Sequence, residues 1–354
     1  MKLGFGIYRH QLERDNLRFA RQCGATHVVV HLVDYFKGLS MSGDQPISGG
    51  FGGGWGEAGD PNQLWTFEQL RKIRSLIESE GLVWHAIENF DPAHWYDVLL
   101  GGPKKEVQLQ HLCEMIEAVG AVGVPVIGYN FSLAGVYGRS SGEWARGGAR
   151  AVGMAGSVDQ EPMPDGMIWN MRCKAAGKSS ALTTVDAGVL WQRLEDFLAA
   201  CLPVAERCGV RLAAHPDDPP VPRLRDTPRL VHRPELYDRL LAIRSSDSNS
   251  LEFCLGTLAE MPDCDLYELT ERYARENKIA YLHCRNVCGT VPDYKEVFID
   301  EGAIDMARIV AILKDCNYDG VLIPDHAPQM SCAAPWHSGM AYTMGYLKAL
   351  MDSL

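Results

Sequence analysis

Short runs of apolar residues alternate along the chain with longer segments in which apolar residues recur every three or four positions. The short runs predict buried strands, and the longer segments predict amphipathic helices. The strands are expected at residues 2–7, 26–32, 82–87, 125–130, 210–214, 251–254, 279–283 and 320–323. The helices are expected at residues 12–23, 66–80, 104–122, 190–208, 234–243, 266–275, 306–316 and 339–351. Strict alternation of eight strands with eight helices predicts an α/β fold that closes into a (β/α)8 TIM barrel.

Glycine stands at four junctions where a predicted helix gives way to the next predicted strand. These residues are Gly81, Gly123, Gly209 and Gly320. Because glycine adopts the left-handed backbone conformation that ends many helices, we expect these positions to be helix C-caps.

Two segments interrupt the alternation, and each follows a predicted strand. Residues 37–63 are rich in Gly, Ser, Asp and Pro, and residues 132–186 form a longer, mixed stretch. Segments inserted after the second and fourth strands rise from the catalytic face of a barrel, where they often act as lids or oligomer contacts. A loop without a role explains the glycine-rich segment equally well. We therefore expect one barrel domain over residues 1–354 with two long insertions.

The composition excludes several classes of protein. Of the 354 residues, 46% are hydrophobic and 22% are charged, as in ordinary globular proteins. The formal net charge of −11 argues against nucleic acid and anionic membranes as partners. The N-terminus lacks the pattern of a secretory signal, and no apolar run is long enough to cross a membrane. Eleven irregularly spaced cysteines are then best explained as reduced thiols in a cytoplasmic protein.

Residues that bind transition metals stand at the ends of four successive predicted strands: His215, Cys254, His283 and Asp325. The C-terminal ends of all strands meet at one face of a barrel. Two imidazoles, a thiolate and a carboxylate suit a divalent first-row metal with room left for a substrate. Each residue alone is more often structural, as a hydrogen-bonded histidine, a small core cysteine or a turn aspartate. Their coincidence at four strand ends favours a metal-dependent enzyme.

Arg285 follows His283 by two positions, so both side chains point to one face of an extended strand. A guanidinium beside a metal can bind a substrate carboxylate through two parallel hydrogen bonds. An ion pair with Asp217 or Asp218 is the structural alternative. Those acids belong to the string His-Pro-Asp-Asp-Pro-Pro at residues 215–220, and they could also orient a ligating imidazole.

Three further polar residues are candidates for contact with a substrate. His326 directly follows Asp325, and a histidine beside a metal is suited to proton transfer near neutral pH. Glu88, at the end of the third predicted strand, could contact a sugar hydroxyl or a histidine that binds the metal. Asn130 falls at the end of the fourth predicted strand and is weak evidence alone.

Several strings in this order make the chain similar to the mannonate dehydratases, a metal-dependent branch of the xylose-isomerase-like TIM barrels. They are Ile-Glu at 87–88, Tyr-Asn-Phe at 129–131, His-Pro-Asp-Asp-Pro-Pro at 215–220, Cys-Leu-Gly-Thr at 254–257, His-Cys-Arg at 283–285 and Pro-Asp-His at 324–326. The resemblance runs through most of the chain. The strings at 215–220 and 324–326 are specific to a family rather than to a fold.

The resemblance implies an activity and a set of roles. The family's metal ligands match His215, Cys254, His283 and Asp325, and its metal is usually Mn2+, sometimes Fe2+. Its catalytic histidine matches His326. The implied reaction removes water from D-mannonate to give 2-keto-3-deoxy-D-gluconate in hexuronate catabolism. Arg285 would help the metal to polarise the substrate carboxylate, and Asn130 and Glu88 would contact this small-molecule sugar acid. A homo-oligomer is common among such barrels.

The chain departs from the family pattern around the substrate pocket. The family places a second catalytic group, a tyrosine, in a Gly-Tyr-Ser/Thr string before the last helix. Tyr342 is the candidate here, one position out of register with Gly345. Ser132 and Ala327 also replace the usual residues. These departures leave open a related isomerase, epimerase or β-eliminating lyase that acts on another sugar or sugar acid. A non-catalytic protein that binds a sugar acid is a further alternative.

Overall fold

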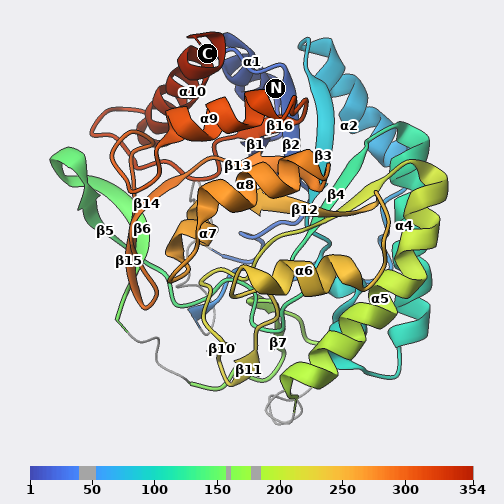
Figure 1. Ribbon diagram of the computed structural model, residues 1–354. Coiled ribbons are helices and arrows are strands. Elements are labelled where there is room, and N and C mark those ends of the chain that lie inside the picture. The colour runs from blue at the N-terminus through green and yellow to red at the C-terminus, as the bar shows by residue number, and fades with distance from the viewer. Residues whose placement is uncertain (40–52, 157–160, 177–184, 354) are drawn as a thin grey trace.

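The computed structural model describes residues 1–39, 53–156, 161–176 and 185–353. Eight parallel strands close into a barrel, in the order in which the chain makes them (Figure 1). They are β1 (Lys2–Ile7), β2 (His27–His31), β3 (Val83–Glu88), β4 (Val126–Tyr129), β9 (Arg211–Ala214), β12 (Asn249–Cys254), β13 (Ile279–His283) and β16 (Val321–Ile323). All eight lie where the apolar runs predict them, so the predicted barrel is confirmed.

The predicted helices also form, with bounds that differ by a few residues. They are α1 (Arg14–Gln22), α2 (Phe67–Ser79), α4 (Lys105–Val122), α5 (Ala187–Cys208), α6 (Glu235–Ala242), α8 (Leu266–Arg275), α9 (Met306–Asp315) and α10 (Pro335–Ser353). Two short helices that the sequence pattern did not predict are α3 (Tyr96–Leu100) and α7 (Leu255–Glu260). Among the described residues, no helix combines the length and the apolar character that crossing a membrane requires.

The strands read as continuous apolar runs because both of their faces are covered. Val29, Ala86 and Val126 meet inside the barrel, while Val28 and Val30 pack outward against the helices. A parallel sheet buried on both sides needs apolar residues at successive positions, which explains why the runs do not alternate.

Three of the four expected C-cap glycines are placed as predicted. Gly123 and Gly209 end α4 and α5 in the left-handed conformation, and Gly81 follows α2 with φ of 74°. The expectation for Gly320 is wrong, because the left-handed residue after α9 is Asn317, with φ of 54°. Asparagine tolerates this conformation better than other residues with a side chain, so it can end a helix as glycine does.

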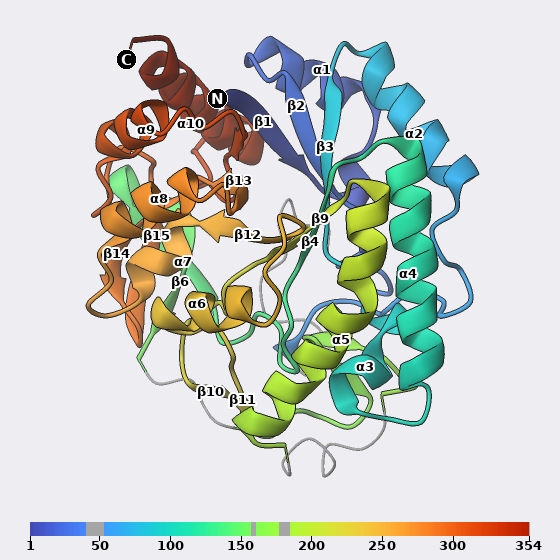
Figure 2. The same ribbon diagram turned by 45° about the vertical axis from the view of Figure 1, so that its right-hand side comes forward.

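Parts of the two insertions build structure over one end of the barrel. An antiparallel sheet in the order β14-β15-β6-β5 joins the second insertion to the segment after β13. Its strands are β5 (Ser140–Ala145), β6 (Ala149–Ala155), β14 (Asn286–Thr290) and β15 (Asp293–Val297). The second insertion also forms the short antiparallel pair of β7 (Met167–Ile168) with β8 (Met171–Arg172). The segment after β9 forms a further pair, β10 (Arg223–Leu224) with β11 (Thr227–Pro228). The two termini lie at the end of the barrel away from β10 and β11 (Figure 2).

The two insertions also contact each other. The Trp55 amide donates to the Asn170 carbonyl over 2.7 Å, and the Arg172 amide donates to the Gly56 carbonyl over 3.0 Å. The expected insertions include residues 40–52, 157–160 and 177–184, which lie outside the described residues.

Candidate metal centre

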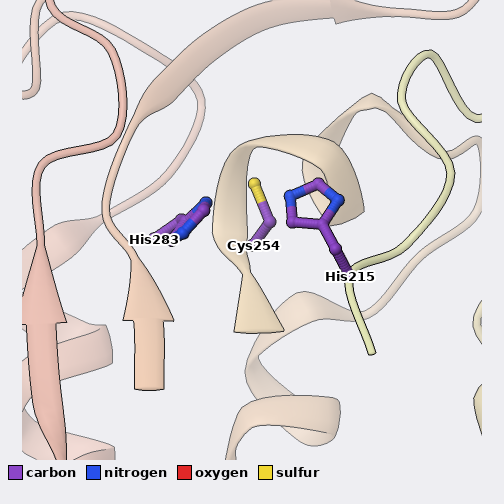
Figure 3. A group of neighbouring side chains, drawn as sticks. All are labelled: His215, Cys254 and His283. Atoms are coloured by element: carbon purple, nitrogen blue, oxygen red, sulfur yellow. The ribbon is translucent and has the colours of Figure 1, made fainter. Parts of the chain in front are cut away.

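Three of the four expected metal ligands face one another at the C-terminal ends of neighbouring strands. His215 follows β9, Cys254 ends β12 and His283 ends β13. One potential ligand atom from each of these residues lies within 4.8 Å of the other two. Figure 3 shows the Cys254 side chain between the two imidazole rings. The closed barrel therefore brings these residues together as predicted.

Cys254 lies in an environment that stabilises a thiolate. It is fully buried, and its sulfur accepts hydrogen bonds from the Thr257 amide over 3.5 Å and the Thr257 hydroxyl over 3.1 Å. Burial raises the pKa of the thiol, but Arg285 and the imidazoles of His215 and His283 outweigh burial and hold that pKa well below its usual value. A thiolate is the form that binds a metal.

The His215 ring is oriented by the backbone of the next residue, Pro216. Its Nδ1 atom lies 2.6 Å from the Pro216 carbonyl oxygen, so Nδ1 carries the proton and donates it. This hydrogen bond leaves Nε2, on the side of Cys254, as the nitrogen that could bind a metal, as expected for a ligand whose second nitrogen is oriented by a carbonyl.

His283 lies between acidic groups on its two edges. Its Nε2 atom is 3.3 Å from Glu88 and 3.3 Å from Glu252, and its Nδ1 atom is 3.6 Å from Asp325. The contact with Glu88 fits the second of the two roles expected for that residue. Burial lowers the pKa of His283, but Asp325 and Glu88 outweigh burial and raise it well above the usual value.

The carboxylates of Glu88 and Glu252 titrate very differently. Burial raises the pKa of Glu88, but His31 and His283 reverse the effect and lower it to about 2. Burial and the nearby charge of Glu88 raise the pKa of Glu252 to about 8. One of the two acids is thus ionised and the other protonated near neutral pH, as is usual for like charges forced together.

Asp325 and His326 lie beside this group. The Asp325 carboxylate contacts His283, and it lies 3.2 Å from Nε of Arg285. Nδ1 of His326 is 2.9 Å from Glu296, and Nε2 is 3.6 Å from Asp325. Burial lowers the pKa of His326, but Asp325 and Glu296 raise it above the usual value, which favours the imidazolium.

The residues present fit a metal ion. Both ring nitrogens of His283 are buried, and neither makes a hydrogen bond of good geometry within the described part of the chain. Buried ring nitrogens without a hydrogen-bond partner destabilise the folded protein. A cation bound between these nitrogens, the thiolate and the carboxylate would remove that cost. His215, Cys254, His283 and Asp325 offer the mixed nitrogen, sulfur and oxygen donors that a divalent first-row metal accepts.

Arg285 is engaged in ion pairs with the protein. Its Nη1 lies 2.6 Å from Glu260 and 3.1 Å from Glu296. Its Nη2 lies 2.8 Å from Asp218, and the same nitrogen donates to the Thr257 hydroxyl over 2.8 Å. The ion pair with Asp218 is the structural alternative anticipated for this residue. An added Cβ on Gly256 would lie 2.4 Å from Cγ of Arg285, so glycine makes room for the guanidinium.

A cavity opens beside the predicted ligands and receives side chains from both insertions. Aromatic rings form much of its wall, with Trp55 and Trp169 5.5 Å apart and Tyr8 stacked on His31 at 4.5 Å. A wall of this kind suits the C–H faces of a sugar chain. The lining residues are Tyr8, His31, Tyr35, Trp55, Glu88, Asn89, Asn130, Val136, Arg139, Trp169, His215, Asp218, Glu252, His283, Asp325 and His326.

Of two residues that the sequence suggested as contacts of a substrate, one lines this cavity and the other does not. Asn130 lines it, and its buried Oδ1 atom has no hydrogen-bond partner among the described residues. Tyr342 does not line it. The Tyr342 ring is 36% exposed on α10, and its hydroxyl lies 3.4 Å from Nη2 of Arg146.

Comparisons with known proteins show the family of the chain. The family model described as D-mannonate dehydratase matches residues 1–354. The chain belongs to the D-mannonate dehydratase family. A mannonate dehydratase of Streptococcus suis (strain 05ZYH33) is 30% identical over 283 residues, which are 75% of each chain. One of Streptococcus pneumoniae (strain 70585) is 29% identical over 283 residues, again 75% of each.

Solved structures of the family and of other enzymes share the fold. The crystal structure of mannonate dehydratase from Streptococcus suis serotype 2 has a TM-score of 0.80 at 24% identity and covers 100% of this chain and 94% of its own. The 3-keto-D-glucoside 4-epimerase of E. coli has a TM-score of 0.58 at 11% identity, with 99% of each chain covered. Both likenesses show the shared barrel fold.

The sequence pattern did not identify several polar residues of the site in this family member, among them Glu252, Tyr281 and Arg139. Glu252 and Tyr281 precede Cys254 and His283 by two positions on their strands, so they point to the same face, and this spacing could have found them. An added Cβ on Gly128 would meet both Glu252 and Tyr281, so a glycine on β4 leaves room for this pair. Arg139 lies in the second insertion, where no periodicity places a side chain.

Proposed function

We propose that the chain is a metal-dependent dehydratase that converts D-mannonate into 2-keto-3-deoxy-D-gluconate and water. The observation that carries this proposal is the match of the D-mannonate dehydratase family model over residues 1–354. The group of His215, Cys254 and His283 beside a cavity that also contains His326 supports it independently.

His215, Cys254, His283 and Asp325 would hold the metal, for which we propose Mn2+, with Fe2+ as the alternative. When bound, the metal supplies a positive charge that acidifies the C–H bond next to the substrate carboxylate. A carboxylate and two imidazoles suit Mn2+, while the thiolate favours softer metals, so the donor set alone does not choose.

The chain's own residues would position the substrate and move protons. The elimination removes the C2 proton and the C3 hydroxyl, and the resulting enol becomes the C2 ketone. His326 lines the cavity, and its Nδ1 donates a hydrogen bond to the Glu296 carboxylate. Because His326 lines the cavity and Glu296 beside Nδ1 stabilises the imidazolium, we assign it the protonation of the departing C3 hydroxyl.

Asn130 and Glu88 line the same cavity and would contact the hydroxyl groups of the sugar acid. The buried Oδ1 of Asn130 is an acceptor that a substrate hydroxyl can satisfy. Arg285 and Tyr342 are assigned no contact with the substrate, because the guanidinium is held by four carboxylates and the phenol lies away from the cavity.

Incubation of the purified protein with D-mannonate and Mn2+ tests the proposal. The expected result is a 2-keto-3-deoxy acid that accumulates with Mn2+ or Fe2+ and is absent after thorough chelation. A product with the composition of the substrate would instead indicate an isomerase or epimerase. Full activity after chelation would contradict the metal dependence.

A further inference from the structure

The side of the cavity that lies across from the predicted metal ligands is built by residues that follow β2 and β3. Tyr35 and Trp55 come from the segment after β2, and Asn89 directly follows β3. In the closed barrel, β2 and β3 lie opposite β12 and β13, which carry Cys254 and His283. A ligand whose reacting end lies at the metal centre therefore extends its other end toward Tyr35, Trp55 and Asn89.

Two buried polar groups on this side of the cavity have no hydrogen-bond partner in the described part of the chain. They are the indole nitrogen Nε1 of Trp55 and the amide oxygen Oδ1 of Asn89, and both residues line the cavity. The indole N–H can only donate a hydrogen bond, and the amide oxygen can only accept one. Because unpaired groups in a buried site cost free energy, a ligand group that pairs with them is bound favourably.

The polar groups next to them are already paired with the protein. Nδ2 of Asn89 donates to the Tyr35 hydroxyl over 3.2 Å, and that hydroxyl lies 3.1 Å from Nδ1 of His31. The second indole of the cavity wall, Trp169, donates its Nε1 proton to the Asn130 carbonyl over 3.1 Å. These bonds hold the Asn89 amide with its oxygen free for a ligand, and they distinguish the unpaired indole from the paired one.

The surroundings of the two groups suit a carbon chain that carries hydroxyl groups. The Trp55 ring packs edge-on against Tyr35 at 5.0 Å and against Trp169 at 5.5 Å. Such rings pack well against C–H groups, while an alcohol hydroxyl can both donate and accept. A carboxylate only accepts, so it could pair with Trp55 but not with Asn89. The two groups therefore match the hydroxyls of a polyol chain better than they match an acid group.

We propose that Trp55 and Asn89 bind the hydroxyl groups at C5 and C6 of the substrate, in the part of the sugar acid that does not react. The inference rests on the proposed function, from which it takes the sugar acid and the position of its reacting end. It makes the enzyme selective for a six-carbon acid over a shorter acid with the same reacting end. It also gives the first insertion a role, since Trp55 belongs to that segment.

Binding of a matched pair of ligands tests the inference. D-Mannonate is compared with L-erythronate, which has the same configuration at C2 and C3 but ends at C4. Both are titrated by calorimetry into Mn2+-loaded protein that carries His326→Asn, so that neither ligand is turned over. Trp55→Phe removes the indole N–H and keeps an aromatic ring. We expect it to weaken the binding of D-mannonate about tenfold, the effect of one lost hydrogen bond, and that of L-erythronate less than twofold.

Asn89→Gly is an independent variant of the same subsite. Asn89 has a φ of 68°, and glycine adopts this conformation without strain, so the variant loses the acceptor and keeps the backbone. We expect the same selective loss for D-mannonate. Trp65→Phe is the matched control, because Trp65 stacks on Phe90 at 5.4 Å and does not line the cavity. It should change the binding of neither ligand.

The comparison of the two ligands separates a contact with the substrate from a structural role. A distorted cavity wall or a lost metal would weaken both ligands alike, so Mn2+ per chain is measured for each variant and should equal the wild-type value. Equal losses for D-mannonate and L-erythronate, or unchanged binding of D-mannonate in either variant, would overturn the inference. If Trp55→Phe does not fold, Asn89→Gly carries the test.

A failure of the proposed function gives a different result. Wild-type protein that forms no 2-keto-3-deoxy acid from D-mannonate, but whose affinity for D-mannonate falls selectively in Trp55→Phe and Asn89→Gly, would keep this inference and refute the reaction. Metal-dependent product formation with the same kcat/KM in wild type and both variants would confirm the reaction and refute the inference.

Discussion

The Glu252 carboxyl lies 3.3 Å from Nε2 of His283, on the edge of the ring opposite to the one that faces Asp325. A histidine that binds a metal through one nitrogen usually gives the other to an acceptor, which fixes the ring and increases its basicity. Glu252 is fully buried inside the barrel and is placed to serve as that acceptor.

We predict that Glu252→Ala lowers metal affinity about 10- to 100-fold, because the His283 ring loses its orientation. Glu252→Gln, which keeps an acceptor oxygen, should lose less. Competition with a chelator measures the metal Kd of each variant. Equal affinity in wild type and both variants would show that Glu252 does not support His283.

His326→Asn should keep the metal and lose turnover. Asparagine retains a polar group beside Asp325 but cannot supply the proton assigned to His326, and such groups contribute about 10²- to 10⁴-fold to rate. The measurement is kcat with D-mannonate, together with Mn2+ per chain. A variant that has lost its metal would instead point to a structural role for the Nδ1 contact with Glu296.

Cys254→Ser should weaken metal retention more than it changes the fold. Serine is nearly isosteric, and its hydroxyl can still accept from Thr257, but it is not an anion at neutral pH. We expect the loss to be larger for Fe2+ than for Mn2+, because the softer metal gains more from sulfur. Retention of both metals at wild-type affinity would remove Cys254 from the ligand set.

The barrel and the grouping of His215, Cys254 and His283 could be predicted from sequence because both depend on local patterns. Buried parallel strands are continuous apolar runs, and a residue at a strand end faces the shared rim. The sheet of β5, β6, β14 and β15 could not be predicted in this way. Its strand β14, with the sequence Asn-Val-Cys-Gly-Thr, lacks an apolar run, and Asp293 of β15 pairs with Ala155 from a distant segment.

The roles of individual polar residues were harder to predict than the position of the site. Arg285 reads as a residue that could bind a substrate, and only the packing shows that buried carboxylates enclose it. Glu252 reads as an ordinary charge on a strand until barrel closure buries it. These distinctions depend on contacts between segments that are far apart in sequence.

Tyr342→Phe should leave activity unchanged, although a tyrosine near this position is expected from the family pattern. Its hydroxyl contacts Arg146 rather than the cavity. Tyr8→Phe is the informative counterpart, because Tyr8 lines the cavity. Burial, and after it the charges of Asp325 and Glu88, raise the pKa of the Tyr8 phenol well above its usual value, so the hydroxyl stays protonated and can donate a hydrogen bond. We expect Tyr8→Phe to lower kcat/KM about tenfold, because the variant loses one hydrogen bond from the Tyr8 hydroxyl to the substrate. If Tyr342→Phe lost turnover and Tyr8→Phe did not, Tyr342 on α10 would have the catalytic role that the family pattern predicts.

His85 predicts how stability depends on pH. Burial lowers its pKa from 6.5 to about 4, with His27, Lys2 and Arg211 acting in the same direction. The unfolded chain takes up a proton near pH 6.5, whereas the folded protein does so only near pH 4. His85 therefore costs no stability above pH 6.5, and it destabilises the fold progressively as the pH falls from 6.5 to 4.

His85→Gln removes this titration and keeps a donor for the Ala280 carbonyl, which lies 3.2 Å from Nε2. From pH 7 to pH 5, the free energy of unfolding should fall by about 2 kcal/mol less in the variant than in the wild type, at about 1.4 kcal/mol per pH unit. Urea unfolding at the two pH values measures the difference. Parallel losses in wild type and variant would mean that His85 is solvated enough to titrate normally in the folded state.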